Sequence, residues 1–178
     1  MLVRHGEASA GWADELDPGL SERGRRQADT VARALAPGGP MAIVSSPLRR
    51  TVETAQPLAD RWGVAVAIEP SVAEVPSPLD ITSRGDWLQG VMAGTWAESG
   101  PALVEWRERL LSAIAAFSVS TVVFTHFVAI NVVVGALTDD PRAMVFAPGN
   151  CSCTILQRDP DAALRLVETG GEAITVVN

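Results

Sequence analysis

Hydrophobic positions along the chain follow two alternating patterns. Short apolar runs predict strands, and apolar residues spaced three or four apart predict helices. The predicted strands up to residue 137 are 2–3, 41–44, 64–68 and 119–125. The predicted helices are 21–36, 46–62, 103–117 and 127–137. Strands and helices therefore alternate through the first three quarters of the chain.

Serines and prolines mark where these elements begin and end. Ser21 is placed to cap the first helix, and Ser46 is predicted to cap the second, with Pro47 as its first helical residue. Pro57 lies inside the second helix and is expected to bend it. The tail carries three further predicted strands, at 151–157, 164–168 and 173–177.

This order of elements predicts an α/β protein. The run 119–125 is apolar throughout, which is typical of a strand buried on both faces of a parallel sheet. We expect a three-layer α/β/α sandwich with a mostly parallel central sheet, formed by residues 1–178 as one domain. Periodicity fades over 69–100, so this stretch is interpreted as a lid or substrate-facing insertion. Its Trp87 and Trp96 are expected to pack inside rather than to line a substrate wall.

Composition narrows the function classes. The net charge is -7, which argues against nucleic acid or an anionic membrane surface as a partner. All 14 basic residues are arginine, so lysine chemistry is excluded. No secretion leader or long apolar run is present, and a cytoplasmic protein is expected. Cys151 and Cys153 are interpreted as small buried apolar residues rather than as a redox or metal pair.

Candidate chemistry gathers at predicted strand ends. Arg4 and His5 end the first strand, and His126 ends the strand 119–125. These are the only two histidines in the chain, and a strand-to-helix junction at 45–50 adds further polar residues. Ligands in parallel sheets bind at the carboxyl ends of strands. We therefore expect these groups to converge at one edge, where guanidinium and imidazole suit an anionic ligand.

Several segments resemble the histidine phosphatase superfamily, also called the phosphoglycerate mutase-like family. The segment Leu2-Val-Arg-His-Gly-Glu7 looks like its N-terminal signature, and Leu20-Ser-Glu-Arg-Gly24 looks like the start of its first helix. The segment Ser46-Pro-Leu-Arg-Arg-Thr-Val-Glu-Thr-Ala55 is similar to its second arginine segment, and Val122-Val-Phe-Thr-His126 to the strand with its second histidine. The motifs occur in the expected order over most of the chain.

This resemblance implies a role for each matching residue. His5 would be the nucleophile that forms a phosphohistidine, while Arg4, Arg50 and His126 would surround the transferring phosphoryl group. Arg50 is preferred to its neighbour Arg49, which is interpreted as a surface charge. Ser9 is a weaker candidate for phosphate contact. Glu7 is expected to contact the residues that bind phosphate without binding phosphate itself. The resemblance requires neither a metal nor another cofactor.

The proton donor to the leaving group is assigned in the same way. Some branches of the family have an aspartate directly after the second histidine, but Phe127 occupies that position here. In other branches a glutamate after the middle strand is the acid, and Glu74 matches it. A solvated loop carboxylate is the alternative for Glu74, and a helix salt bridge with Glu22 or Glu53 is the alternative for Arg50. Phe127 could narrow the pocket or pack against its helix, and the sequence leaves both open.

Three functions remain open at this point. The preferred one is a metal-independent phosphomonoester hydrolase that acts on a small phosphorylated substrate or a phosphoprotein. A phosphoglycerate mutase-type phosphotransferase is less favoured, because Ala8 and Gly11 stand where family mutases carry serine and asparagine. The third is a module that binds phosphorylated ligands without turnover. The oligomeric state is not predicted.

Overall fold

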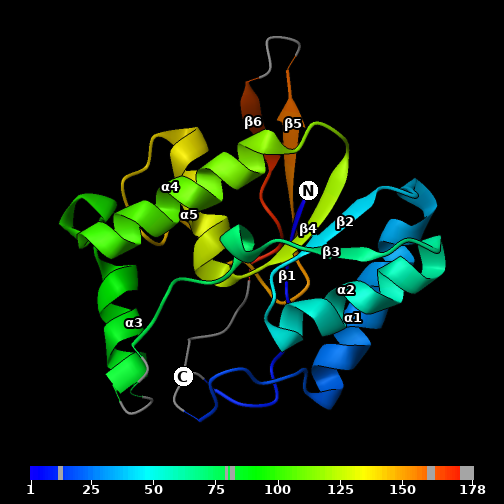
Figure 1. Ribbon diagram of the computed structural model, residues 1–178, viewed down its shortest axis with the longest axis horizontal. Coiled ribbons are helices and arrows are strands. Elements are labelled where there is room, and N and C mark those ends of the chain that lie inside the picture. The colour runs from blue at the N-terminus through cyan, green and yellow to red at the C-terminus, as the bar shows by residue number, and fades with distance from the viewer. Residues whose placement is uncertain (12–13, 79, 81–82, 160–162, 173–178) are drawn as a thin grey trace.

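The computed structural model describes residues 1–178 except 12–13, 79, 81–82, 160–162 and 173–178. A six-stranded sheet in the order β3-β2-β4-β1-β5-β6 forms its centre (Figure 1). Its strands are β1 (Leu2–Arg4), β2 (Ala42–Ser45), β3 (Val66–Ile68), β4 (Thr121–Thr125), β5 (Cys153–Arg158) and β6 (Leu164–Glu168). The first four are parallel, whereas β5 and β6 pair antiparallel. The predicted strand 173–177 lies outside the described residues.

Helices cover both faces of this sheet. They are α1 (Glu22–Leu35), α2 (Arg49–Trp62), α3 (Arg84–Ala93), α4 (Pro101–Ala116) and α5 (Phe127–Thr138), with short 3₁₀ turns η1 (Ala36–Gly38), η2 (Pro70–Val72) and η4 (Trp96–Glu98). In Figure 1, α1 and α2 lie on one side of the sheet, and α4 and α5 lie on the other. The predicted three-layer α/β/α sandwich is confirmed. Across the described ranges, no helix is both long enough and apolar enough to span a bilayer.

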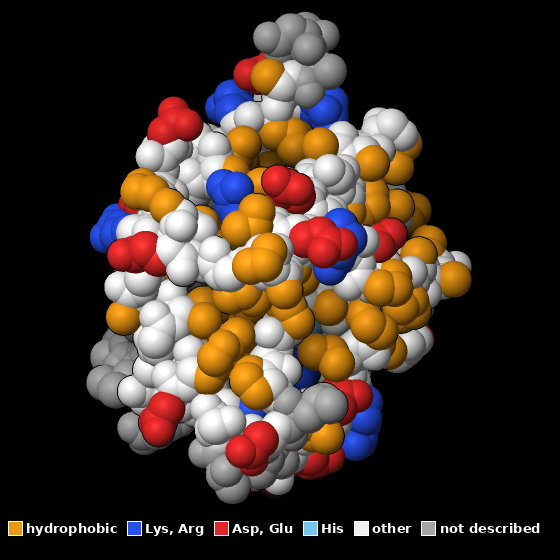
Figure 2. Space-filling model, turned by 60° about the vertical axis from the view of Figure 1, so that its left-hand side comes forward, with side chains coloured by type: hydrophobic (Ala, Val, Ile, Leu, Met, Phe, Trp, Pro, Cys, Tyr) orange, Lys and Arg blue, Asp and Glu red, His pale blue; other side chains and the backbone are white. Residues whose placement is uncertain are grey.

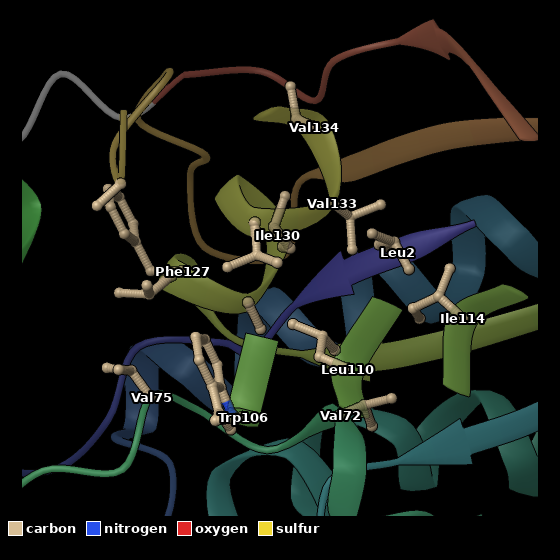
Figure 3. Close-up of a cluster of buried hydrophobic side chains, with 14 of the residues drawn as sticks. Leu2, Val72, Val75, Trp106, Leu110, Ile114, Phe127, Ile130, Val133 and Val134 are labelled. Carbon is tan, nitrogen blue, oxygen red and sulfur yellow. The ribbon is translucent and has the colours of Figure 1, made fainter. Parts of the chain in front are cut away.

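Neighbouring residues of each strand contribute to two separate cores. Leu2 packs with α4 and α5, whereas Val3 packs with α1 and α2, because successive side chains of a strand point to opposite faces. All five residues of β4 are buried, as the apolar run predicted for a central parallel strand. Figure 3 shows the cluster on the α4 and α5 side, which includes Leu110 and Ile130.

The two predicted helix caps have different outcomes. Ser21 caps α1 as predicted, since its Oγ accepts the N–H of Gly24 at 2.9 Å. The prediction that Ser46 caps the second helix is wrong, because α2 begins at Arg49 with Leu48 at the N-cap position. The backbone stays extended at Leu48, and the Ser46 hydroxyl is used in the site described below.

The stretch 69–100 is anchored to the core instead of lying loosely over it. It contains η2, α3 and η4, and Val72, Leu88 and Trp96 are buried among the residues of the α4 and α5 core. The indole N–H of Trp106 also donates to the carbonyl of Ala73 at 3.3 Å. The predicted packing of Trp96 is confirmed, and Trp87 is half-buried at the rim of the same cluster.

Candidate active site

Three strands of the sheet end side by side and deliver polar residues to one edge. The parallel register pairs Arg4 with Thr125 and Ser45 with Phe124, so the residues that follow each strand are neighbours. His5 and His126 come next in the chain, and their ring centroids lie 5.2 Å apart. The structure therefore brings together the two histidines that the sequence analysis expected to converge.

The His5 ring is held with one nitrogen free for attack. Its Nδ1–H donates to the carbonyl of Gly6 at 2.7 Å, which leaves the lone pair on Nε2. Arg50 donates from Nε to this Nε2 at 3.3 Å. Burial lowers the pKa of His5 well below its ordinary value, and the charges of Arg50 and Arg4 lower it further. The ring is therefore a neutral imidazole near pH 7, as a nitrogen nucleophile must be.

Backbone contacts fix the position of His5. The N–H of Gly6 donates to Thr54 on α2 at 3.0 Å, and the side-chain amide of Asn150 donates to the His5 carbonyl at 3.0 Å. A Cβ on Gly6 would lie only 2.7 Å from the carbonyl oxygen of Gly24 in α1. The strand end therefore packs against α1 so closely that only glycine fits.

Two guanidinium groups flank the histidines. Arg4 donates from Nη1 to the carbonyl of Pro148 at 2.7 Å, and Arg50 is 7% exposed with Nη1 3.9 Å from a carboxylate oxygen of Asp17. Burial lowers the pKa of both arginines, and the Glu74 carboxylate opposes the change. Both side chains stay charged at neutral pH, because guanidinium titrates far above it. The edge thus offers two desolvated positive charges to an anion.

The adjacent Arg49 has a different environment. Its side chain is 59% exposed and lies near Glu53 at 3.6 Å, as expected for a surface charge. Glu53 also pairs with Arg25, and Glu22 pairs with Arg26, so the alternative salt bridge for Arg50 is not formed. Of the two adjacent arginines, Arg50 is therefore the one that lies beside His5.

His126 is fully buried and its orientation depends on a residue that the sequence analysis missed. Its Nε2 lies 2.8 Å from the Oγ of Ser46, which also accepts the N–H of Leu48 at 3.2 Å. We assign the Ser46 hydroxyl proton to the bond with Nε2, because this neutral ring can then keep its own proton on Nδ1. Nδ1 has no hydrogen-bond partner among the described residues. An N–H donor is therefore available to a ligand.

Glu74 is a buried carboxyl group at the start of α5. It is 8% exposed, and its oxygens accept the N–H groups of Val75, Val128 and Ala129 at 2.9 to 3.2 Å. Burial raises the pKa of Glu74, although these hydrogen bonds and the charge of Arg50 act against it. The alternative of a solvated loop carboxylate is wrong. A carboxyl group with a raised pKa beside the arginines can serve as a general acid.

Two weaker candidates lie outside this cluster. Glu7 accepts the Ser21 hydroxyl at 2.8 Å and pairs with Arg23 at 3.4 Å, so it supports the start of α1. Ser9 is exposed, and its backbone N–H donates to Gly19 at 2.9 Å. Across the described part of the chain, its hydroxyl makes no hydrogen bond to the histidines or arginines.

Other sites in the molecule are less suited to this chemistry. Cys151 and Cys153 are free, half-buried thiols, and burial raises the pKa of Cys151 to about 12, so neither is a reactive thiolate. A groove of about 620 Å³ lies between α1 and α2, but its charges already pair with each other, as Arg61 does with Asp29 at 2.6 Å. Within the described ranges, no group of three or more His, Cys, Asp or Glu residues could hold a metal ion.

The surface agrees with a recessed site. In the space-filling view of Figure 2, no histidine side chain is visible on this face. His5 is 7% exposed and His126 is completely buried. Burial of this kind strengthens the electrostatic attraction between the arginines and a bound anion.

Comparison with curated proteins gives named relatives. The chain is 36% identical over 112 residues to a glucosyl-3-phosphoglycerate phosphatase from Mycolicibacterium vanbaalenii. The aligned region covers 61% of this chain and 47% of that protein. The chain thus spans about half the length of the curated relatives it matches first.

Solved structures share the fold over nearly the whole chain. A mycobacterial glucosyl-3-phosphoglycerate phosphatase superposes with a TM-score of 0.75 at 27% identity, covering 97% of this chain and 98% of that one. A phosphoserine phosphatase from Entamoeba histolytica, solved with 3-phosphoglyceric acid, gives a TM-score of 0.76 at 21% identity, covering 96% and 95%. Residues 1–169 also match the sequence profile of the histidine phosphatase superfamily, branch 1. The chain therefore belongs to branch 1 of the histidine phosphatase superfamily.

Proposed function

We propose that this chain is a metal-independent phosphomonoester hydrolase that works through a phosphohistidine on His5. The observation that carries the proposal is the neutral His5 ring. Its Nε2 accepts a hydrogen bond from Arg50, and its ring centroid lies 5.2 Å from that of His126. Phosphoryl transfer depends mainly on positioning and on stabilising charge on the phosphoryl oxygens. These groups are suited to both tasks.

In the first step, Nε2 of His5 attacks phosphorus and the bond to the leaving oxygen breaks. Arg50 now donates to Nε2, so a bound phosphoryl oxygen would take over this donor and free the lone pair. The hydrogen bond from Nδ1 to Gly6 stabilises the positive charge that develops on the ring. Glu74, whose raised pKa favours the acid form, gives its proton to the leaving oxygen.

In the second step, water attacks the phosphohistidine. The Glu74 carboxylate takes the proton of this water, the bond between phosphorus and Nε2 breaks, and inorganic phosphate leaves. Arg4, Arg50 and the Nδ1–H of His126 would bind the three equatorial oxygens in both steps. The cycle returns His5 and Glu74 to their starting states.

The substrate is proposed to be a small phosphorylated metabolite. Relatives are named for glucosyl-3-phosphoglycerate and phosphoserine, so both compounds, together with 3-phosphoglycerate and a phosphopeptide, form the first screen. Ranking them by kcat/KM would separate a metabolite from a phosphoprotein substrate. Product analysis with labelled phosphate would reveal a mutase, because the label would then appear on a second hydroxyl instead of in free phosphate.

The decisive experiment is to trap the phosphorylated enzyme with a radiolabelled substrate and to measure the stability of the label in acid and in base. We expect a base-stable, acid-labile label on the wild type and none on His5→Ala. Arg50→Ala should lower kcat/KM by on the order of a hundredfold or more, the range seen when one charge-stabilising donor is removed. Arg49→Ala is the matched control and should keep most of the activity. Equal labelling of wild type and His5→Ala would refute the proposal, and tight vanadate binding without turnover would favour the binding module.

A further inference from the structure

Phe127 occupies the position directly after His126, where the sequence left its role open. It is the first residue of α5 and is 9% exposed. Its ring belongs to the core cluster that contains Val75 and Trp106, and Figure 3 shows it at one end of that cluster. Hydrophobic packing therefore explains the contacts of Phe127 with the core, but it does not explain the charged group on the ring.

A charged group lies over this ring. The Cζ atom of Arg4 is 5.1 Å from the ring centroid of Phe127, within the range of a cation–π contact. The contact follows from the sheet, because Arg4 on β1 is paired in register with Thr125 on β4, two residues before Phe127. The register of two parallel strands thus places the aromatic ring beside the guanidinium.

Arg4 has few other attachments in the protein. Its Nη1 donates to the carbonyl of Pro148, but its Nε is buried and has no hydrogen-bond partner among the described residues. A buried donor without an acceptor is rare in folded proteins, and at a ligand-binding edge the ligand can supply the acceptor. The Nδ1 of His126 is in the same situation at the neighbouring strand end. Both unpaired donors would be satisfied by the oxygens of one phosphoryl group.

We propose that Phe127 is a positioning residue that holds the guanidinium of Arg4 in place for the phosphoryl group. One carbonyl bond at Nη1 leaves the planar group free to rotate about that contact, and the flat ring removes this freedom. The ring also supplies its electron-rich face to a cation that has lost much of its water. The role rests on the proposed phosphatase function, and it concerns an aromatic residue at a position where some family branches have an aspartate.

A double-mutant cycle tests this role. Phe127→Leu keeps the apolar bulk but removes the aromatic face, and it should lower kcat/KM and the affinity for vanadate by on the order of tenfold. Phe127→Trp keeps an aromatic face and should retain most of both. In an Arg4→Ala background, Phe127→Leu should have almost no further effect, because the group that it positions is gone.

The outcomes separate positioning from packing. Equal losses from Phe127→Leu in the presence and absence of Arg4 would overturn the proposal, since packing alone would then explain them. So would full activity and full vanadate affinity of Phe127→Leu. Unfolding temperatures of all variants ensure that each assay is run on folded protein. If the wild type has no turnover, the phosphatase function fails, but the same cycle measured by vanadate calorimetry still decides whether Phe127 acts through Arg4.

Discussion

At the scale of single residues, the site depends on two imidazoles that stay neutral for the same reason. Burial is the largest cause of the lowered pKa of His5 and of His126, and nearby arginine charges act in the same direction. Their roles then differ through one hydrogen bond each. Gly6 holds the proton of His5 on Nδ1, whereas Ser46 leaves the Nδ1–H of His126 available to a ligand. In the proposed mechanism, the His5 ring is the nucleophile and the His126 ring is a hydrogen-bond donor to the phosphoryl group.

Ser46 is accordingly expected to matter for catalysis. Ser46→Ala removes the donor to Nε2, so the His126 proton can move to Nε2 and Nδ1 loses its ability to donate to phosphate. We expect kcat to fall about tenfold, which corresponds to one lost hydrogen bond of about 1.4 kcal/mol. Nitrogen chemical shifts of the His126 ring should report the change of tautomer.

Ser45→Ala provides the matched control for this prediction. Ser45 is also buried, but its hydroxyl donates to the backbone carbonyl of Ser46 at 2.8 Å, whereas the hydrogen bond to His126 comes from Ser46. It should leave kcat nearly unchanged. If Ser45→Ala and Ser46→Ala reduce kcat equally, the tautomer assignment is wrong.

At the scale of elements, the beginning of α5 combines structure and chemistry. His126 is the N-cap residue of this helix but offers no side-chain cap, and Glu74 from the segment after β3 supplies the acceptor for Val128 and Ala129. A carboxylate at a helix N-terminus is stabilised by the free N–H groups and the helix dipole. Desolvation nevertheless wins and raises the pKa of Glu74.

Glu74→Gln should therefore separate proton donation from capping. The amide oxygen can still accept one of the two helix N–H groups that the carboxylate oxygens accept now, but no proton can be given to the leaving group. We expect kcat/KM for alkyl phosphates to fall by about 10²–10⁴, with a much smaller loss for an aryl phosphate that leaves without a proton. The wild type should lose activity on alkyl phosphates as the pH rises above the raised pKa, and this limb should disappear in the variant.

Glu69→Gln is the control for loss of a capping carboxylate alone. Glu69 accepts the N–H of Ser71 at 2.8 Å at the start of η2 and lines a surface groove with Glu105 and Arg109. Its replacement should alter neither the leaving-group dependence nor the pH profile. An equal loss across the whole leaving-group series in Glu74→Gln would remove Glu74 from the acid role.

At the scale of the whole molecule, the buried histidines link folding to pH. Because the folded-state pKa of His126 lies well below the ordinary value of 6.5, the unfolded chain binds a proton first as the pH falls. Stability is then complete above pH 6.5 and decreases below it, by up to about 1.4 kcal/mol per pH unit for each such histidine. Glu74 has a raised pKa and acts in the opposite sense, since its burial costs more as the pH rises through 4.5.

Urea unfolding at pH 7 and pH 5 should reveal this linkage. The wild type is expected to lose more stability between these values than His126→Asn, which has no proton to gain. His5 shares the effect, so the variant should show a reduced slope instead of a flat one. An identical pH dependence in both proteins would mean that the pKa of His126 is the same in the folded and the unfolded chain.

Much of this architecture could be predicted from the sequence, because it depends on periodicity and on strand ends. The alternation of apolar runs and helical stripes predicts the sandwich, and the position of His5 and His126 after two parallel strands predicts their proximity. The preference for Arg50 over Arg49 came from the family resemblance, and it stays a prediction that the burial of Arg50 favours. Helical periodicity alone does not say which of two adjacent arginines points inward.

Other features depend on three-dimensional contacts that leave little local signal. Ser46 resembles an ordinary helix cap in the sequence, and only the packing of β2 beside β4 brings it to His126. The contact between Phe127 and Arg4 joins the first residue of α5 to the last residue of β1. In the same way, the capping of α5 by Glu74 spans more than 50 residues. Each could be found only after the strand register was known.

The contact between Gly24 and Glu7 has a consequence for the tolerance of the molecule to change. A Cβ on Gly24 would lie 2.1 Å from the Glu7 carbonyl oxygen, so two bare peptide groups set the separation of α1 from the loop behind His5. Any side chain at this point would push the loop away from α1 and so change the orientation of His5 relative to the arginines. The spacing between His5 and the two arginines thus depends on a contact between two backbone segments in which no side chain takes part.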